Sequence, residues 1–123
     1  MAAAGSGGSG AQAATFTQVY ALFMTSCAGS TCHVNATRAG DMLVMNDKAT
    51  AYKNLVGVNA VSCQGEKRVV AGDPNKSELV HALAHTQVGS CARTPRMPDN
   101  KPMLSAADID KVKSWVQAGA LDN

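Results

Sequence analysis

The chain has 123 residues, which is the usual length of one small domain. Hydrophobic residues make up 46% of the sequence but aromatic residues only 4%, so the core has few bulky side chains. A small domain with such a core is often stabilised further by disulfides or a cofactor, and the chain has four cysteines. A net charge of +2 excludes a strongly basic nucleic-acid-binding protein. No apolar run approaches the roughly 18–20 residues that a membrane-spanning helix needs.

The first 14 residues differ in composition from the rest of the chain. Residues 1–14 contain only Met, Ala, Gly, Ser and one Gln, and the run Gly5–Gly10 is typical of a flexible linker. This segment has neither the basic start nor the long apolar stretch of a secretory signal peptide. We interpret residues 1–14 as a flexible linker or a remnant of recombinant expression, and residues 15–123 as the folded domain.

The first helical pattern follows directly. Apolar side chains recur there at positions i, i+3, i+4 and i+7, which places them on one face of a helix: Phe16, Val19, Tyr20 and Phe23. Thr15 or Thr17 can cap this helix, which then continues to Cys27.

Two further helices are expected in the middle of the chain. One spans residues 48–56, with Asp47 as its N-cap and Gly57 as its stop signal. Its inner face carries Tyr52, Leu55 and Val56. The other begins near Pro74, because proline is tolerated in a first turn, and ends before Gly89. It contributes Leu79, Val80 and Leu83.

The last helix has the clearest boundaries. Ser105 resembles the first residue of a capping box, and apolar residues at helical spacing predict a helix over 106–118 that packs Trp115 inward. Before it, residues 69–70 could form a short strand, and the proline-containing stretch 89–104 is predicted to be a loop. Loops this long in a small domain are usually functional or are ordered by something they wrap.

One motif in the chain points to chemistry. Cys27, Cys32 and His33 form a C-x4-C-H pattern, two residues longer than the C-x-x-C-H motif of covalent haem attachment. In that motif two thiols add to the haem vinyl groups and the adjacent histidine is delivered to the iron. Taken alone, the pattern also allows a small disulfide loop between the two cysteines or a metal site.

A second ligand would complete such a haem site. A histidine-bound haem iron in an electron-transfer protein normally takes a methionine or a second histidine on its other face. Met97 lies in the proline-containing loop among polar residues, where it has little core to fill, whereas Met103 is a better candidate for the core. His81 and His85 have the i, i+4 spacing that can chelate a metal, and either could replace Met97 as the ligand.

The order of these features resembles a known family. The similar segments, from the cysteine pair to the last helix, are Cys27–His33, Tyr52–Val58, Ala71–Ser77, Arg96–Pro98, Leu104–Ser105 and Trp115–Ala120. Together they resemble the small monohaem cytochrome c domains of periplasmic bacterial proteins, especially the divergent kind common in myxobacteria. The resemblance covers about residues 15–123, and the Cys-Cys-His and Met-Pro elements are its most specific parts.

The resemblance implies an all-α, cytochrome c-like fold of about four short helices with long loops wrapped round one haem c. Cys27 and Cys32 match the cysteines that bind haem covalently. His33 and Met97 match the two axial ligands of the iron. We expect the haem to fill the centre of the domain, so that the short helices pack on it rather than on one another.

The other two cysteines lie outside the haem motif. Cys63 and Cys91 could form a disulfide between the middle of the chain and the Met97 loop, because an even cysteine count is typical of small exported domains. They could also be buried free thiols, and a zinc site made by all four cysteines is a weaker alternative. Disulfides and haem c both indicate the periplasm or the extracellular side.

The function expected is electron transfer without substrate chemistry, so the protein is not predicted to be an enzyme. Its partners would be redox proteins, met singly or within a larger electron-transfer assembly, and neither nucleic acid nor a membrane span in this chain is expected. The alternative is a haem-free, disulfide-stapled extracytoplasmic module for binding or interaction. A haem enzyme or gas sensor with a five-coordinate iron is a third option.

Overall fold

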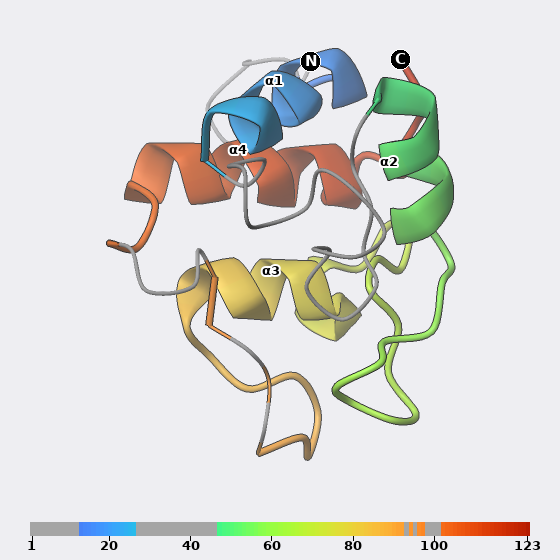
Figure 1. The fold of residues 1–123 in the computed structure, drawn as a ribbon, viewed down its shortest axis with the longest axis vertical. Coiled ribbons are helices and arrows are strands. Elements are labelled where there is room, and N and C mark those ends of the chain that lie inside the picture. The colour runs from blue at the N-terminus through green and yellow to red at the C-terminus, as the bar shows by residue number, and fades with distance from the viewer. Residues whose placement is uncertain (1–12, 27–46, 93, 95, 98–101) are drawn as a thin grey trace.

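The computed structural model describes residues 13–26, 47–92, 94, 96–97 and 102–123. This part of the chain is helical and has no strand, as the predicted all-α class requires. Its elements are α1 (Phe16–Ser26), α2 (Lys48–Leu55), the 3-10 helix η3 (Pro74–Lys76), α3 (Glu78–Ala84) and α4 (Ala106–Gln117). Figure 1 shows α4 lying between α1 and α3, with α2 at one side.

The N-terminus of α1 has a complete set of hydrogen-bond acceptors. Thr15 and Gln18 form a capping box, since the Thr15 hydroxyl accepts from Gln18 N–H at 3.2 Å and Thr15 N–H donates to Gln18 Oε1 at 2.9 Å. Asn123 accepts the bonds of the two preceding N–H groups of the helix. The Phe16 N–H donates to the side-chain oxygen of Asn123, and the Thr17 N–H donates to the main-chain oxygen of Asn123. These bonds fix the start of α1 against the C-terminal segment.

The caps predicted for α2 and α4 are confirmed. The Asp47 carboxylate accepts from Thr50 N–H at 2.8 Å, and the Ser105 hydroxyl accepts from Asp108 N–H at 3.1 Å. Gly57 follows α2 with a φ of +75°, a left-handed conformation that glycine adopts without a steric penalty. Short polar side chains and glycines therefore set these helix ends, as the sequence indicates.

The helix predicted from Pro74 is divided. Residues Pro74–Lys76 form one 3-10 turn, Ser77 is extended with a ψ of 116°, and α3 begins only at Glu78. The side chain of Ser77 is fully buried and bonds to main-chain groups of the preceding turn, which competes with a continuous helix. The helix also ends early, at Ala84, four residues before Val88.

The strand suggested at residues 69–70 is wrong. Val69 forms only an isolated parallel bridge with Val56, and Lys67 forms isolated bridges with Asn59 and Ser77. Each bridge connects single residues of irregular loops. A strand needs a run of bonded neighbours, and the described residues provide none beside Val69.

The core is built by helices that contact one another directly. Phe16 of α1 lies 4.9 Å from the Trp115 ring of α4 and 5.3 Å from the Tyr52 ring of α2, measured between centroids. Phe16 and Trp115 are almost fully buried, and the Trp115 indole N–H donates to Leu121 O at 2.8 Å. The helices of the described part of the chain therefore pack on one another, contrary to expectation, and Phe16, Tyr52 and Trp115 meet at one junction.

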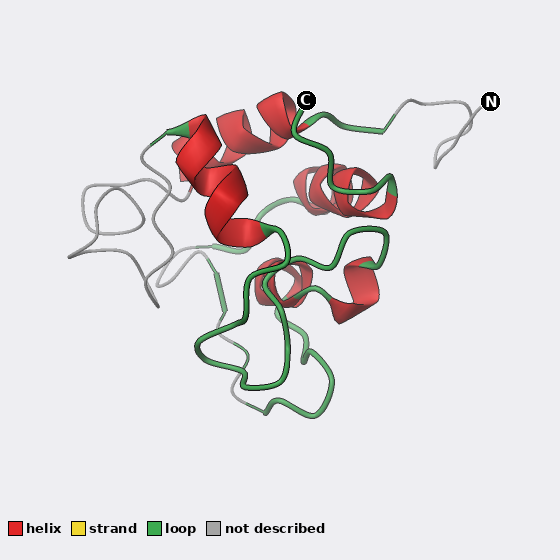
Figure 2. Cartoon of the chain, turned by 90° about the vertical axis from the view of Figure 1, so that its right-hand side faces the viewer, coloured by secondary structure: helices red, strands yellow, loops and turns green. Residues whose placement is uncertain are grey.

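The long loops gather at the opposite end of the molecule. The loop between α2 and η3 and the loop that follows α3 extend together on the side of α3 away from α1, as Figure 1 shows. Figure 2 shows the same arrangement from the side, with the loops in green below the helices. A small second cluster of buried residues lies between these loops: Ala60, Cys63 and Val88.

Candidate functional site

Of the residues predicted to bind a haem, only Met97 lies in the described part of the chain. Cys27, Cys32 and His33 lie outside the described residues, whereas Met97 lies inside them. The last residue of α1 is Ser26, so the cysteine motif begins directly where this helix ends, as the sequence predicts. The surroundings of Met97 are therefore the part of the site that the structure describes.

Met97 is half-buried and packs against the main core cluster, which includes Leu83 of α3 and Trp115 of α4. Met103, in contrast, is 49% exposed. The prediction that Met103 rather than Met97 packs in the core is wrong, because it rested on the neighbours of each methionine in the chain. Burial of Met97 arises from tertiary contacts that the flanking polar residues do not reveal.

The main chain of Met97 is held on both sides. Its N–H donates to Ala82 O of α3 at 3.0 Å, and its carbonyl lies 3.3 Å from His85 Nε2. Because a carbonyl oxygen only accepts, the imidazole donates through Nε2. Met97 is thus fixed to the C-terminal end of α3 although it follows that helix by more than ten residues.

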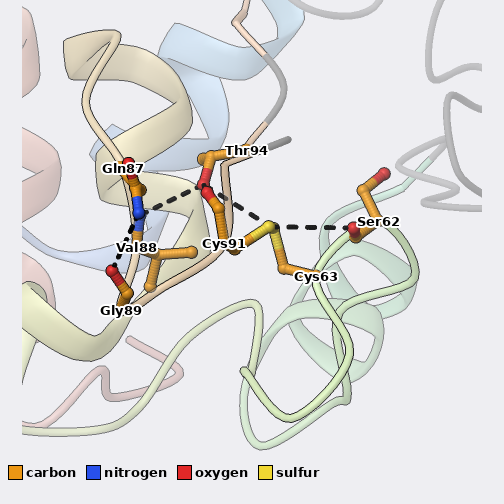
Figure 3. The surroundings of a disulfide bond; sticks show 7 residues. All are labelled: Ser62, Cys63, Gln87, Val88, Gly89, Cys91 and Thr94. Carbon is orange, nitrogen blue, oxygen red and sulfur yellow. Dashed lines mark hydrogen bonds between the residues drawn. A yellow bond between two sulfur atoms is a disulfide. The ribbon is translucent and has the colours of Figure 1, made fainter.

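The disulfide between Cys63 and Cys91 is present. It joins the loop before η3 to the loop after α3, with Cα atoms 5.6 Å apart and a sequence separation of 28 residues. Cys63 is almost fully buried and Cys91 half-buried. Figure 3 shows the two sulfur atoms between these loops. The bridge holds the beginning of the segment that leads to Met97.

Thr94 organises the turn next to the disulfide. Its hydroxyl accepts from Val88 N–H at 3.1 Å and donates to Cys91 O at 3.0 Å, and it lies 3.6 Å from Cys63 Sγ (Figure 3). The role of Thr94 was not predicted from the sequence. A threonine three residues after a cysteine is too common a pattern to reveal such a role.

The two histidines have separate roles. His81 Nδ1 lies 2.6 Å from the Thr86 hydroxyl and His81 Nε2 lies 2.6 Å from Asn75 O, so both ring nitrogens are hydrogen-bonded. His85 Nε2 is bonded to Met97 O. Coordination of a metal by His81 would break one of these bonds. The i, i+4 spacing alone suggested a chelating pair, but each ring is directed to a different main-chain carbonyl.

Two titratable groups have shifted pKa values: Tyr20, in the middle of α1, and Asp47, the N-cap of α2. Burial raises the pKa of Tyr20 on α1, and the negative charge of Asp47 raises it further. Hydrogen bonds from the Thr50 N–H and hydroxyl lower the pKa of the Asp47 carboxyl. Both shifts have local causes, so they describe packing and capping and assign no acid–base chemistry to these residues.

Met97 carries a donor atom of a kind that suits a haem iron. Met97 contributes a thioether, a soft neutral sulfur ligand, and its half-buried position gives it apolar surroundings. Within the described ranges, no group of three or more His, Cys, Asp or Glu side chains is placed to hold a metal ion. Met97 therefore has the donor chemistry of one face of the proposed site, and Cys27, Cys32 and His33 would supply the rest.

Neither protein-family models nor curated proteins nor solved structures match this chain. The described residues also include no helix that is both long and apolar enough to cross a bilayer.

Proposed function

We propose that this protein is a monohaem c-type cytochrome that transfers electrons. Cys27 and Cys32 would hold the haem through thioether bonds, with His33 and Met97 as the axial ligands of the iron. The observation that carries the proposal is the placement of Met97, which is half-buried against the core and bonded through both its N–H and its carbonyl. A methionine held in this way can present its sulfur in one position.

The bound haem would supply one-electron exchange between ferric and ferrous iron. The residues of the chain set the conditions for that exchange. Met97 raises the reduction potential relative to a second histidine, and the apolar side chains of the core limit the access of water. Since His33 and Met97 would both bind the iron, the proposal includes no substrate site, and the partners would be other redox proteins.

The proposed location is the periplasm or the extracellular side. The disulfide between Cys63 and Cys91 supports it, because disulfides persist in oxidising compartments. Covalent attachment of haem c has the same requirement for export. The proposed partners are redox proteins, met singly or within a larger electron-transfer assembly.

The intact mass of the protein tests the proposal most directly. Protein made in cells with haem-attachment machinery should carry the added mass of one haem, stain for haem after denaturation in detergent, and show a Soret band. Colourless protein with no added mass would contradict the proposal.

The role of Met97 has its own test. Met97→Ala should abolish the sulfur-to-iron charge-transfer band at the red edge of the visible spectrum, because the thioether is lost. Met103→Ala is the matched control, since Met103 is 49% exposed and should leave the band unchanged. A band that survives Met97→Ala would show that the sulfur of another residue holds the iron. A parent protein that lacks the band would point to a histidine ligand such as His85 or to an open site.

A second candidate is a haem-free module for binding or interaction, stapled by disulfides. The observation that favours it is the bridge between Cys63 and Cys91, which needs no haem. Cys27 and Cys32 would then form a second disulfide. The same mass measurement separates the two candidates, because two disulfides remove only four hydrogens from the chain.

A further inference from the structure

His85 has a backbone conformation that is uncommon for residues other than glycine. Its φ of 58° and ψ of 40° place it in the left-handed region at the C-terminal end of α3. Glycine is the ordinary residue at such a helix end, followed by asparagine, because a β-carbon is disfavoured there. A histidine at this position therefore suggests that its side chain has a use.

The left-handed turn at His85 also changes the hydrogen bonds of the helix end. Thr86 N–H donates to His81 O at 2.9 Å instead of continuing the helix to Ala82 O. The Ala82 carbonyl is thereby left to the N–H of Met97, which donates to it at 3.0 Å. The turn thus creates the acceptor that binds one side of Met97.

The imidazole of the same residue binds the other side. His85 Nε2 donates to the Met97 carbonyl at 3.3 Å, and the ring is half-buried. One residue therefore contributes twice to the position of Met97, through its backbone conformation and through its side chain. A glycine would provide the first contribution and not the second.

We propose that His85 is a positioning residue that fixes Met97 for coordination of the haem iron. The inference rests on the proposed function, in which Met97 is an axial ligand. His85 itself is not a ligand in this arrangement, since its Nε2 is directed to the Met97 carbonyl. Its imidazole restrains the segment from which the thioether projects.

The test uses three substitutions of His85 in the haem-loaded protein. His85→Gly and His85→Asn keep a residue that tolerates the left-handed conformation, but they remove a donor long enough to reach the Met97 carbonyl. His85→Gln places an amide N–H at about the reach of Nε2 and should restore the bond. All three leave the acceptor Ala82 O in place.

Hydrogen exchange of the Met97 amide, measured by NMR, is the first readout. In the Gly and Asn variants this amide should exchange about three- to tenfold faster, and in the Gln variant at nearly the parent rate. The Gly72 amide, which donates to Val116 O on α4, is the internal control and should not change. Unchanged exchange at Met97, or equal acceleration at Gly72, would overturn the proposal.

Affinity of the ferric protein for added imidazole is the second readout, because imidazole competes with Met97 for the iron. The Gly and Asn variants should bind imidazole about three- to tenfold more tightly than the parent protein does. An unchanged affinity would also overturn the proposal. Failure of the proposed function is seen separately, as a parent protein whose mass contains no haem. The amide readout needs no iron and reports on His85 by itself.

Discussion

At the scale of single residues, Ser77 shows how a small polar side chain determines a turn. Its hydroxyl accepts from Val70 N–H at 2.8 Å and donates to Asp73 O at 2.9 Å, and the residue is fully buried. These bonds explain why the segment from Ala71 to Ser77 is compact.

Replacement of Ser77 by alanine should destabilise the fold. The substitution leaves the Val70 N–H without its acceptor, which costs about 1–3 kcal/mol when the group is kept from water. Urea unfolding followed by circular dichroism would measure this loss. Ser90→Ala is the matched control, because Ser90 is exposed, and equal midpoints for the two variants would contradict the prediction.

Residues whose position depends on distant contacts could not be predicted. Met97 and Met103 are six residues apart in one loop region, yet one packs against the core and the other is 49% exposed. Likewise, the left-handed conformation of His85 cannot be read from a histidine near a helix end. Both features depend on how the loop returns to α3, and that information lies in contacts far apart along the chain.

At the scale of elements, helix ends were predictable because their causes are local. Asp47 and Ser105 each accept from the N–H three residues later, so the capping residue and its partner lie within one turn. The division of the helix at Ser77 was not predictable from periodicity, since the residues from Asn75 to Glu78 are all polar and carry no apolar spacing. The buried hydroxyl of Ser77, a tertiary feature, decides it.

The cap of α2 should make the stability of the protein depend on acid pH. Bonds from Thr50 hold the pKa of Asp47 below its ordinary value of 3.8, so the carboxylate stabilises the folded state above that pH. This stabilisation is lost as the pH falls through the lowered pKa of the folded state. Asp47→Asn keeps a capping side chain and removes the charge.

Urea midpoints of the parent and of Asp47→Asn should therefore differ most above about pH 4 and converge toward pH 2. The other carboxylates are common to both proteins and cancel in this difference. A difference that stays constant over the whole range would show that the charge of Asp47 does not contribute to the cap.

At the scale of the whole molecule, the helices and the loops form two regions with different sources of order. The helices bury Phe16, Tyr52 and Trp115 against one another, whereas the loop end has only a small buried cluster around Cys63 and Val88. An even cysteine count was enough to suggest the bridge in this second region. The sequence did not reveal that the aromatic residues would meet at one junction, because they come from three separate helices.

The disulfide between Cys63 and Cys91 should contribute much of the order of the loop end. A bridge that spans 28 residues lowers the entropy of the unfolded chain, and loop-closure arguments give a stabilisation of about 3.5 kcal/mol. The double variant Cys63→Ser/Cys91→Ser should lower the free energy of unfolding by about that amount in urea titrations. Ser90→Ala, an exposed position in the same loop, controls for a general sensitivity of this region.

The same double variant separates a local effect of the bridge from a global one. If the bridge acts through the unfolded chain, the helices should keep their far-ultraviolet circular dichroism in the native state while the urea midpoint falls. If the bridge also restrains the loop in the native state, the Met97 amide should exchange faster, because Cys91 lies at the start of the segment that carries Met97. A midpoint equal to that of the parent would mean that the packing around Thr94 and Val88 holds the two loops together without the covalent bond.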